Sequence, residues 1–334
     1  MSNNSKSSGS TVDAQNTAPL VYDLDGLYLL DTHHQGRAGI IGSYLVPHAD
    51  NSDQFMLIEC GPGSSLAVLE QAVNQAGFSM ANLSSVLVTH IHLDHAGAAG
   101  ALAQNYGARV YVHEGGAPHL ADPRRLWNSA SRIYGDAMNT LWGEMLAVPA
   151  DKLVSLQGND TLTVGGHTIR VIHSPGHAGS HVVYQLNGNL FTGDAAAIAM
   201  GDAGDACTLV RPAVPPPEVN LELWHTTFQT LRNLKADRLL LTHFGAITDV
   251  TMHLEVAEAE TQRWAEIILA GLQAGEDNDA LAKRLNAHVQ QTYEAAGLAE
   301  ALRARYNTTS NDAMSVMGLT RYWKKHHPER LKAS

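Results

Sequence analysis

Three histidines and one aspartate are concentrated in the segment at residues 89–97, which reads THIHLDHAG. His90 and His92 are two residues apart, so both rings project to the same side of an extended chain, whereas Asp94 and His95 can turn toward a second point. Imidazole nitrogens and carboxylate oxygens are ligands for zinc, manganese and iron. Scattered surface histidines on a polar loop explain this density poorly. The spacing predicts metal ligands and fits two adjacent ions better than one.

Three later residues could complete such a site, because each follows a predicted strand. His177 lies in SPGHAGSH, Asp194 in FTGD and His243 in LTHFG. Loops at strand ends of a layered sheet converge into sites. Taken singly, a histidine or aspartate in this position is more often a capping or surface group. Together with residues 89–97, the three support one site built from imidazole and carboxylate groups.

The chain around these residues is predicted to alternate strands and helices in its first half. Short apolar runs broken by turn residues predict strands, and apolar residues at helical spacing predict helices. The predicted strands are residues 27–30, 39–46, 55–58, 86–88 and 109–113, and the predicted helices are residues 64–76 and 98–106. This alternation favours a layered α/β sandwich over an all-helical or an all-β fold.

The second half returns to strand signals and then becomes helical. Residues 200–217 predict a loop, because their prolines fit neither a helix interior nor a central strand. After about residue 250 only helical spacing remains. The predicted strands are residues 162–164, 168–172, 181–184, 189–191 and 238–242; the predicted helix is residues 216–235; and the predicted buried face of the last region is Leu254, Ala257, Thr261, Trp264 and Ile268.

These patterns divide the chain into three predicted parts. Residues 1–18 are rich in Ser, Asn, Thr and Gln and poor in large apolar side chains, which predicts a disordered tail. Residues 19–250 form the predicted α/β domain. Residues 251–334 form a predicted helical region packed on it.

Composition narrows the classes of function. The 334 residues carry 22 Lys+Arg against 33 Asp+Glu, a net charge of -11, and include 18 His but only 2 Cys. An acidic chain lacks the basic face that phosphate binding needs, so we expect no nucleic-acid partner. Cys60 and Cys207 are far apart, so we expect neither a disulfide framework nor a cysteine zinc site. Without a long apolar run or a signal-like block, the sequence predicts a cytoplasmic protein with no membrane partner.

The segment THIHLDH and the later His177, Asp194 and His243 together resemble the metallo-β-lactamase superfamily. The pattern of that family is THxHxDH followed by single His, Asp and His ligands on later strand ends. The resemblance covers about residues 20–250. It implies an α/β fold of the four-layer αββα type, to which the C-terminal helices are appended.

By position, the resemblance assigns the seven candidate ligands to two metal ions. The first ion would be bound by His90, His92 and His177, the second by Asp94, His95 and His243, and Asp194 would bridge them. The implied cofactors are two divalent metal ions, with zinc expected and manganese or iron as alternatives.

The resemblance is incomplete at one supporting position. The family usually has an Asp in the turn after an early strand, whereas this turn reads IECGPG and Glu59 is the candidate substitute. His173 and His181 flank His177. Because His173 ends a predicted strand and His181 starts one, we expect both to support the ligands or the fold rather than to bind metal.

A pair of divalent ions indicates hydrolysis by water. Two such ions can share a water, lower its pKa and deliver hydroxide to an electrophilic carbon or phosphorus near pH 7. Asp94 is the expected catalytic residue, binding metal and accepting a hydrogen bond from that bridging water. A carboxylate at the bridging position, here Asp194, makes the chain similar to the glyoxalase-type thioesterases and the lactonases of this family. We expect cleavage of an ester, thioester or lactone bond in a small, partly hydrophobic substrate.

Alternative interpretations remain at this stage. One alternative is an iron-dependent dioxygenase, because persulfide dioxygenases resemble this fold and keep much of the same motif around a single iron. The other is a sensor that uses the site only as a ligand pocket. The segment from Trp127 to Met145 is either core or pocket lining, and Arg211 is either a surface residue or an anion contact. A homodimer is the base-rate expectation for the oligomer.

Overall fold

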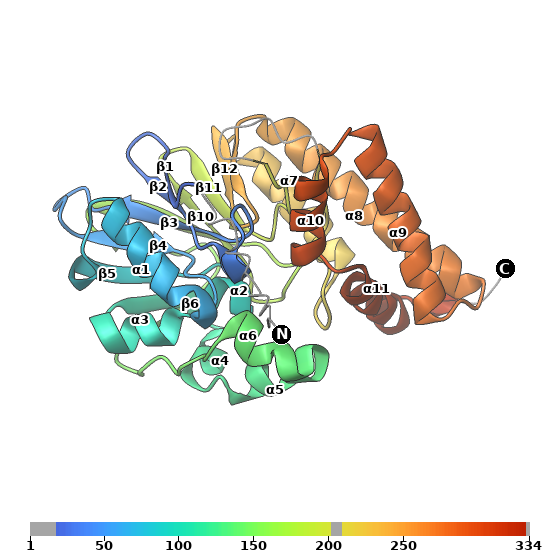
Figure 1. Cartoon of the computed structure of the whole chain (residues 1–334), viewed down its shortest axis with the longest axis horizontal. Coiled ribbons are helices and arrows are strands. Elements are labelled where there is room, and N and C mark those ends of the chain that lie inside the picture. Colours follow the sequence, from blue (N-terminus) through green and yellow to red (C-terminus); the bar gives the residue numbers. More distant parts are fainter. Residues whose placement is uncertain (1–17, 202–208, 332–334) are drawn as a thin grey trace, which may run out of the picture.

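Two β-sheets lie face to face at the centre of the computed structural model, which describes residues 18–201 and 209–331 (Figure 1). Helices cover the outer face of each sheet, and the C-terminal helices stand beside the sandwich. The expected four-layer α/β fold with a helical C-terminal region is confirmed. The predicted disordered tail at residues 1–18 lies, apart from Ala18, outside the described residues.

The first sheet has the strand order β1 to β7. Strands β1 to β4 pair antiparallel, and β4 to β7 pair parallel, so the loops that follow these parallel strands share one edge. The strands are β1 (Val21–Asp23), β2 (Tyr28–Asp31), β3 (Gly42–Pro47), β4 (Phe55–Ile58), β5 (Leu83–Leu87), β6 (Arg109–His113) and β7 (Leu153–Leu156). The helices in this half are α1 (Leu66–Gln75), α2 (Leu93–Ala96), α3 (Ala99–Tyr106), α4 (Ala117–Ala121), α5 (Arg124–Tyr134) and α6 (Met138–Trp142).

The second sheet has the strand order β13-β12-β11-β10-β9-β8. Only β11 and β12 pair parallel in it, and helix α7 (Leu221–Asn233) lies between them in the chain. The strands are β8 (Thr161–Val164), β9 (His167–His173), β10 (Val182–Leu186), β11 (Asn189–Gly193), β12 (Arg238–Leu241) and β13 (Gly245–Ile247). Short 3₁₀ helices are η1 (His34–Gly36), η2 (Gly63–Ser65), η3 (Met80–Asn82), η4 (Gly135–Ala137) and η5 (Pro328–Leu331).

Alternating side chains on the strands divide the apolar core into layers. In β4, Phe55 and Leu57 pack in the cluster under α1 and α3, whereas Met56 and Ile58 pack in the cluster between the two sheets. This is the period-two pattern of a strand that is buried on both faces. A third cluster joins the second sheet to α7 and the C-terminal helices. Both sheets are therefore covered on both faces, as a four-layer sandwich requires.

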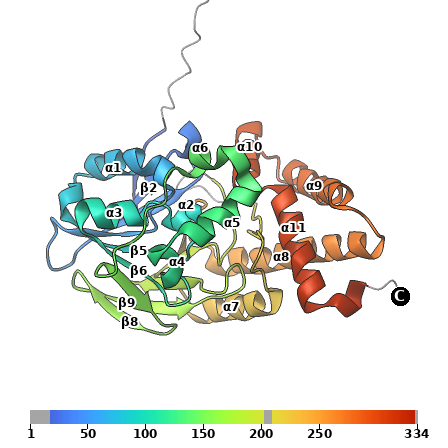
Figure 2. The same ribbon diagram turned by 90° about the horizontal axis from the view of Figure 1, so that it is seen from below.

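Four helices follow the sandwich: α8 (Val250–Gln273), α9 (Asn278–Ala295), α10 (Glu300–Thr309) and α11 (Asp312–His326) (Figure 2). The predicted face of α8, from Leu254 to Ile268, is buried. The side chains of Asp249 and Asp277 accept backbone hydrogen bonds at the starts of α8 and α9. The domain division at residue 250 stays a prediction, although α8 begins at Val250. Within the described part of the chain, no helix has the length and apolar character to cross a membrane.

Some elements differ from the sequence prediction. Strands β1, β7 and β13 are short and were not predicted. The helix predicted from residue 216 begins only at Leu221, where the Asn220 side chain accepts a hydrogen bond from the Leu223 backbone N–H. Because proline cannot donate to a helix and Asn220 caps the first turn, the helix starts after the proline run.

Arg211 joins the loop before α7 to the C-terminal helices. Its guanidinium is buried and pairs with Asp312 Oδ1 at 2.9 Å. It also donates hydrogen bonds to Tyr293 Oη, Asn307 Oδ1 and the Ser310 carbonyl. Both sequence interpretations of Arg211 are wrong, because it neither lies on the surface nor is free to contact an anion. The ion pair and hydrogen bonds of Arg211 instead attach the C-terminal helices to the loop before α7.

Replacing Arg211 with Met should lower the free energy of unfolding by about 3–5 kcal/mol, because Asp312, only 19% exposed, then keeps its charge with a hydrogen bond from the Asn286 amide but without the cation that balanced it. Urea unfolding measures the difference. The double variant Arg211→Met with Asp312→Asn should recover part of the loss, since it removes the uncompensated carboxylate. A loss below about 1 kcal/mol in the single variant, the range of surface ion pairs, would contradict this account.

Candidate metal centre

All seven candidate ligands lie where strands end, and the fold brings them together in two groups. The first group is His90, His92, His177 and Asp194, and the second is Asp94, His95 and His243; the candidate donor atoms within each group lie within 4.8 Å of one another. Residues 90–95 follow β5 and enter α2, while the other three follow β9, β11 and β12. Their role as metal ligands stays a prediction, but the predicted grouping is present.

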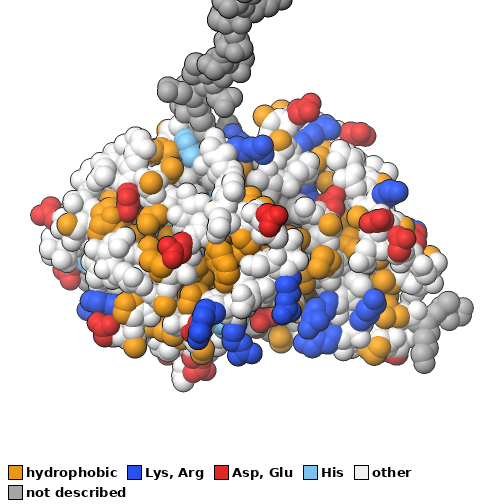
Figure 3. All heavy atoms as spheres, turned by 60° about the horizontal axis from the view of Figure 1, so that its bottom comes forward, with side chains coloured by type: hydrophobic (Ala, Val, Ile, Leu, Met, Phe, Trp, Pro, Cys, Tyr) orange, Lys and Arg blue, Asp and Glu red, His pale blue; other side chains and the backbone are white. Residues whose placement is uncertain are grey.

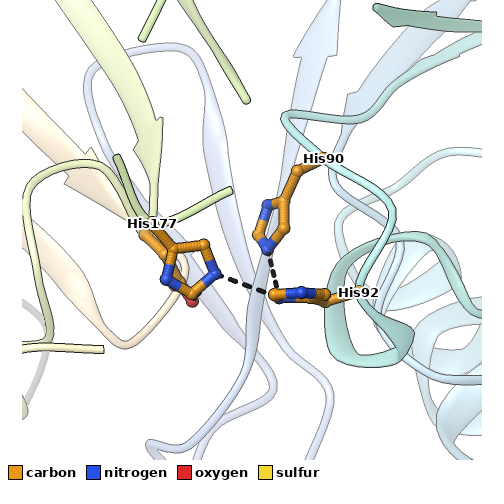
Figure 4. A group of neighbouring side chains, drawn as sticks. His90, His92 and His177 are labelled. Carbon is orange, nitrogen blue, oxygen red and sulfur yellow. Dashed lines mark hydrogen bonds and ion pairs between the residues drawn. The ribbon is translucent and has the colours of Figure 1, made fainter. Parts of the chain in front are cut away.

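Three imidazole nitrogens converge in the first group (Figure 4). His92 Nδ1 lies 2.9 Å from His90 Nε2 and 3.0 Å from His177 Nε2. The outward nitrogens fix which of these atoms carry protons. His177 Nδ1 donates to the Ala213 carbonyl at 2.7 Å, because a carbonyl can only accept. His177 Nε2, in the neutral ring, therefore presents a lone pair to His92.

Thr89 determines in the same way which ring nitrogen of His90 carries the proton. The Thr89 hydroxyl donates to Glu59 Oε1 at 2.5 Å, so its oxygen accepts from His90 Nδ1 at 3.0 Å. His90 Nε2 is left with a lone pair. The single proton that His92 Nδ1 could carry cannot serve both facing nitrogens, whereas a cation between the three would be bound by all of them.

The second group is organised by carboxylates. His95 Nε2 lies 3.7 Å from Asp94 Oδ2, and His243 Nε2 lies 3.3 Å from the same oxygen. On the outward side, His243 Nδ1 donates to the Ile40 carbonyl at 2.7 Å. Both rings therefore direct Nε2 at the carboxylates, with Nδ1 used to fix their orientation.

Asp194 faces both groups at once. Its Oδ2 lies 3.3 Å from His177 Nε2, while its Oδ1 lies 3.4 Å from His95 Nε2 and 3.6 Å from His243 Nε2. One carboxylate oxygen is thus directed at each group, which is the arrangement that a bridging ligand needs. The residue before it, Gly193, has φ +48°, and a Cβ there would lie 2.2 Å from Thr89 Oγ1. Only glycine lets Asp194 approach this closely.

Two buried polar atoms at this meeting point, His95 Nε2 and Asp194 Oδ1, make no hydrogen bond to a described residue and have only the 3.4 Å ion-pair contact with each other and longer contacts of the same kind. A buried polar group without a partner costs about 1–3 kcal/mol, so such atoms point to a bound group. Imidazole nitrogen and carboxylate oxygen are ordinary ligands of zinc. The donor set and its unpartnered atoms therefore fit two divalent cations.

Glu59 fills the supporting position where the sequence departs from the family pattern. Its Oε1 accepts from the Thr89 hydroxyl and lies 3.3 Å from His95 Nδ1. A carboxylate that accepts the outward N–H of a histidine fixes the ring and raises its basicity as a ligand. Through Thr89 the same carboxylate also orients His90. One side chain thus supports a ligand in each group.

Glu59→Gln should weaken the binding of at least one metal ion by about 10–100-fold, because it removes the negative charge beside His95 Nδ1 and puts an amide NH2 group where Oε2 accepts from the Thr89 backbone N–H. Competition with a chromophoric chelator measures the affinity. Glu70→Gln is the matched control, since Glu70 accepts from the Tyr106 hydroxyl outside both ligand groups. Equal affinities in the two variants would show that Glu59 has no supporting role.

Their surroundings keep the histidines of the first group neutral. Burial, and then the neighbouring imidazoles, hold the pKa of His90 well below its usual range. Burial, and then His177, lower the pKa of His92 to about 3. Burial also lowers the pKa of His177, although Asp194 opposes it. A neutral imidazole is the form that binds a metal ion.

The second group has the opposite electrostatics. Burial favours the neutral ring of His95, but Asp194, Asp94 and Glu59 together outweigh it and raise the pKa well above its usual range. The carboxylates of Asp194 and Asp94 likewise outweigh burial and raise the pKa of His243. Without a metal, these two rings hold protons that an incoming cation must displace.

We expect two equivalents of bound zinc to leave in separate steps as the pH falls. The ion at Asp94, His95 and His243 should dissociate at the higher pH, because protons compete best for rings whose pKa is raised. The first group should keep its ion to lower pH, because lowered pKa values leave its nitrogens unprotonated. Equilibrium dialysis between about pH 8 and pH 5 with metal analysis tests this. Release of both equivalents in one step would contradict it.

A cavity of about 370 Å³ opens onto the ligands. His92, Asp94, His177, Asp194 and His243 line one part of it. The remaining walls come from η1 and the loop after it, from α5 and α6, from residues 213–217, from residues 308–315, and from Leu93 and Ile198. Figure 3 shows hydrophobic side chains gathered over the face that carries α5 and α11. Among the described residues that line the cavity, none is Lys or Arg.

The segment from Trp127 to Met145 contributes to both the core and the cavity, which resolves the alternatives left open by the sequence. Tyr134 and Trp142 line the cavity, whereas Met138 and Met145 are buried in the core under the first sheet. The helical spacing alone did not distinguish these fates, because core and cavity lie on adjacent sides of the same short helices.

The flanking histidines have supporting positions. His181 is buried, and its Nε2 accepts a hydrogen bond from the Asp194 backbone N–H at 3.2 Å. His173 is exposed and stacks on His113 with ring centroids 4.8 Å apart. Neither belongs to the two ligand groups. Cys60 is buried and its thiol donates to the His95 carbonyl, while Cys207 lies outside the described residues.

Sequence reasoning missed the groups that orient the ligands from outside. Thr89 was part of the motif, yet its hydroxyl between Glu59 and His90 received no role. The carbonyls of Ile40 and Ala213 gave no signal, since every residue has one. Only the fold shows which carbonyls meet the ligands.

A family model described as the metallo-beta-lactamase superfamily matches residues 37–243 of this chain, which is more than half of its length. The match includes all seven candidate ligands and Glu59. It ends before the C-terminal helices.

The individual relatives share less than 30% sequence identity with this chain. The metallo-beta-lactamase fold-containing protein ST1585 of Sulfurisphaera tokodaii is 28% identical over 58% of this chain and 73% of its own length. A probable polyketide biosynthesis zinc-dependent hydrolase of Bacillus velezensis and a hydroxyacylglutathione hydrolase of Aeromonas hydrophila are each 29% identical, and the match spans only 39% of either relative. A metallo-beta-lactamase family protein of Thermus thermophilus aligns with a TM-score of 0.62 and 22% identity over 90% of this chain and 94% of its own.

Proposed function

The chain belongs to the metallo-beta-lactamase superfamily, and on that premise we propose that it is a metal-dependent hydrolase of ester, thioester or lactone bonds. The observation that carries the proposal is Asp194, whose two carboxylate oxygens face two separate ligand groups. Relatives named as hydrolases agree with it. We further propose two divalent ions as cofactors, with zinc preferred because one relative is named zinc-dependent, and with manganese and iron as alternatives.

Such ions, when bound, supply Lewis acidity that polarises a carbonyl and lowers the pKa of water toward neutrality. The residues of the chain contribute orientation and a base. Burial opposes ionisation of Asp94, but His95 and His243 outweigh it and hold the pKa of this carboxyl below its usual value. Its side chain is 23% exposed and borders the cavity. Asp94 can therefore accept a hydrogen bond from the attacking water and help to orient it.

The cavity indicates which substrates fit. Its wall combines Leu126, Ile133, Trp142 and Met314 with the proline run at residues 215–217. A buried apolar wall favours hydrophobic parts of a ligand. The absence of Lys and Arg among its described lining residues disfavours a substrate whose anionic end lies inside the cavity. We therefore propose an uncharged acyl or lactone moiety as the part that enters, in the glyoxalase-type or lactonase-like branch of the family.

Protein loaded with zinc or manganese should hydrolyse members of a panel of p-nitrophenyl esters, acyl thioesters and hydrophobic lactones. Dialysis against a chelator should abolish the activity, and two equivalents of metal should restore it. Asp194→Asn should lower kcat/KM by about 10²-fold or more, because the amide gives up the charge shared by both groups.

Three results would contradict the hydrolase proposal. Absence of chelator-sensitive hydrolysis across the whole panel would remove it. Purification with a single iron per chain, together with oxygen uptake on a persulfide, would favour the dioxygenase alternative. Tight binding of a small molecule without turnover would favour a sensor.

A further inference from the structure

The imidazole of His34 borders the cavity and is only 4% exposed, yet it forms no hydrogen bond to any described residue. Its Nδ1 is buried without a partner. The ring stacks on Trp142 with centroids 5.5 Å apart and planes 17° from parallel. Trp142 Nε1 is also buried without a partner among the described residues. Two polar nitrogens in one aromatic pair are therefore unsatisfied at the wall of the cavity.

Unsatisfied buried nitrogens are costly, at about 1–3 kcal/mol for each, and native proteins keep few of them. If the ring at this position served only to pack against Trp142, a Phe side chain would do so without the free-energy cost of burying an unpaired nitrogen. The cost is smallest if the buried Nδ1 carries only a lone pair and the proton is on Nε2. Nε2 is not among the buried unpartnered atoms and forms no hydrogen bond to a described residue, so it is the nitrogen that can donate to a ligand in the cavity. His34 and Trp142 come from segments far apart in the chain, so the fold, and not local sequence, creates the pair.

The backbone holds His34 in place at the expense of strain. His33 has φ 41° and Gln35 has φ 56°, so two non-glycine residues in the left-handed region flank it. Such residues cost about 1–3 kcal/mol each and occur where surrounding structure enforces them. The buried carboxylate of Asp31 accepts hydrogen bonds from the backbone N–H groups of His33 at 3.0 Å and Gly39 at 2.6 Å. The Gln35 side chain donates to the Thr140 carbonyl on α6 at 2.6 Å.

The same loop is coupled to the candidate metal centre. Ile40, six residues after His34, accepts the hydrogen bond from His243 Nδ1 and also borders the cavity. Asp94 and His243 are close enough to influence the His34 ring electrostatically. His34 is nevertheless absent from both ligand groups. Burial, the main cause, lowers its pKa, so the ring is neutral near pH 7 and carries one N–H donor.

We propose that His34 is a further active-site residue, which donates a hydrogen bond to an oxygen of the substrate's acyl group while Trp142 fixes its ring. The proposal rests on the hydrolase function proposed above. It assigns a substrate-contacting role to a residue outside the metal-binding motif. No proton is transferred in this role: the neutral imidazole keeps its proton and stabilises charge that develops on the acyl oxygen.

His34→Phe tests the proposal, because it preserves the stacked ring and removes both nitrogens. With the best substrate of the hydrolysis panel, we expect kcat/KM to fall by about 10²-fold, the usual effect of losing one donor to a developing oxyanion. Metal content and thermal stability should stay at wild-type values. His34→Gln, which offers an amide donor on a side chain of similar reach, should recover part of the loss.

His288→Phe is the matched control, because it makes the same replacement on α9, outside the cavity and both ligand groups. The His288 ring pairs with Glu260 at 3.0 Å, so its replacement should change kcat/KM little. Binding of hexylphosphonate, a tetrahedral acyl mimic, gives a readout that does not require turnover. Calorimetry should show affinity at least about fivefold weaker in His34→Phe than in wild type, and the ¹⁵N resonances of the His34 ring should shift when wild type binds the phosphonate.

The outcomes separate this inference from the proposed function. If wild type hydrolyses the panel and His34→Phe keeps its kcat/KM and its phosphonate affinity, the inference is wrong and the hydrolase proposal stands. If wild type hydrolyses nothing, the hydrolase proposal fails, and phosphonate binding alone decides the role of His34. If both variants lose metal or fold poorly, the ¹⁵N titration of wild type decides, and unchanged His34 resonances overturn the proposal.

Discussion

The close approach of buried ligand groups is the constraint on which the rest of this structure depends. Lone pairs of His90 and His177 face one nitrogen of His92, and the carboxylates of Asp94 and Asp194 lie among the rings of the second group. Without a metal ion, the first group leaves lone pairs facing one another, and the second group needs protons on its rings to balance the carboxylates. The surrounding protein must therefore hold each ring in one orientation and one tautomer before any metal arrives.

The fold meets this requirement through acceptors that lie outside the cluster. The carbonyls of Ala213 and Ile40 take the outward protons of His177 and His243, and Glu59 performs the same task for His95 directly and for His90 through Thr89. Each acceptor belongs to a different loop. Two sheets packed face to face bring these loops to one edge, so the stability of the sandwich is also what preorganises the candidate centre.

The C-terminal helices complete the cavity, and a buried charge attaches them. Arg211 lies two residues before Ala213, the residue that orients His177, and its backbone pairs with Ile198 in both directions. Its side chain is held by α9, by α10 and by the start of α11. The wall formed by residues 308–315 and the orientation of a candidate ligand are thereby linked to one short segment. Most of the cavity lining lies within residues 37–243, which match the superfamily, and His34 and residues 308–315 add walls from outside that match.

Much of the layered fold was predictable, because it follows from short-range patterns. Alternating apolar residues gave the longer strands, and helical spacing identified the buried face of α8 from Leu254 to Ile268. The short strands β1, β7 and β13 escaped prediction because three or four residues carry too little periodicity against their neighbours. The start of α7 was misplaced because a side-chain cap at Asn220, and not the proline run, marks it.

For the candidate centre, the sequence by itself determined the candidate ligands, since the spacing within residues 89–97 and the strand-end positions of His177, Asp194 and His243 are local properties. Their division into two groups was implied by the family resemblance, and the structure brings them together in two such groups. Only the tertiary structure decided which groups orient the candidate ligands. It also decided that the buried Arg211 side chain attaches the C-terminal helices and that His34 stacks on Trp142 at the cavity wall. The physical reason is distance along the chain. Glu59 and His95 are 36 residues apart and His34 and Trp142 lie on different segments, so their contacts arise from how the loops of two sheets and the attached helices converge.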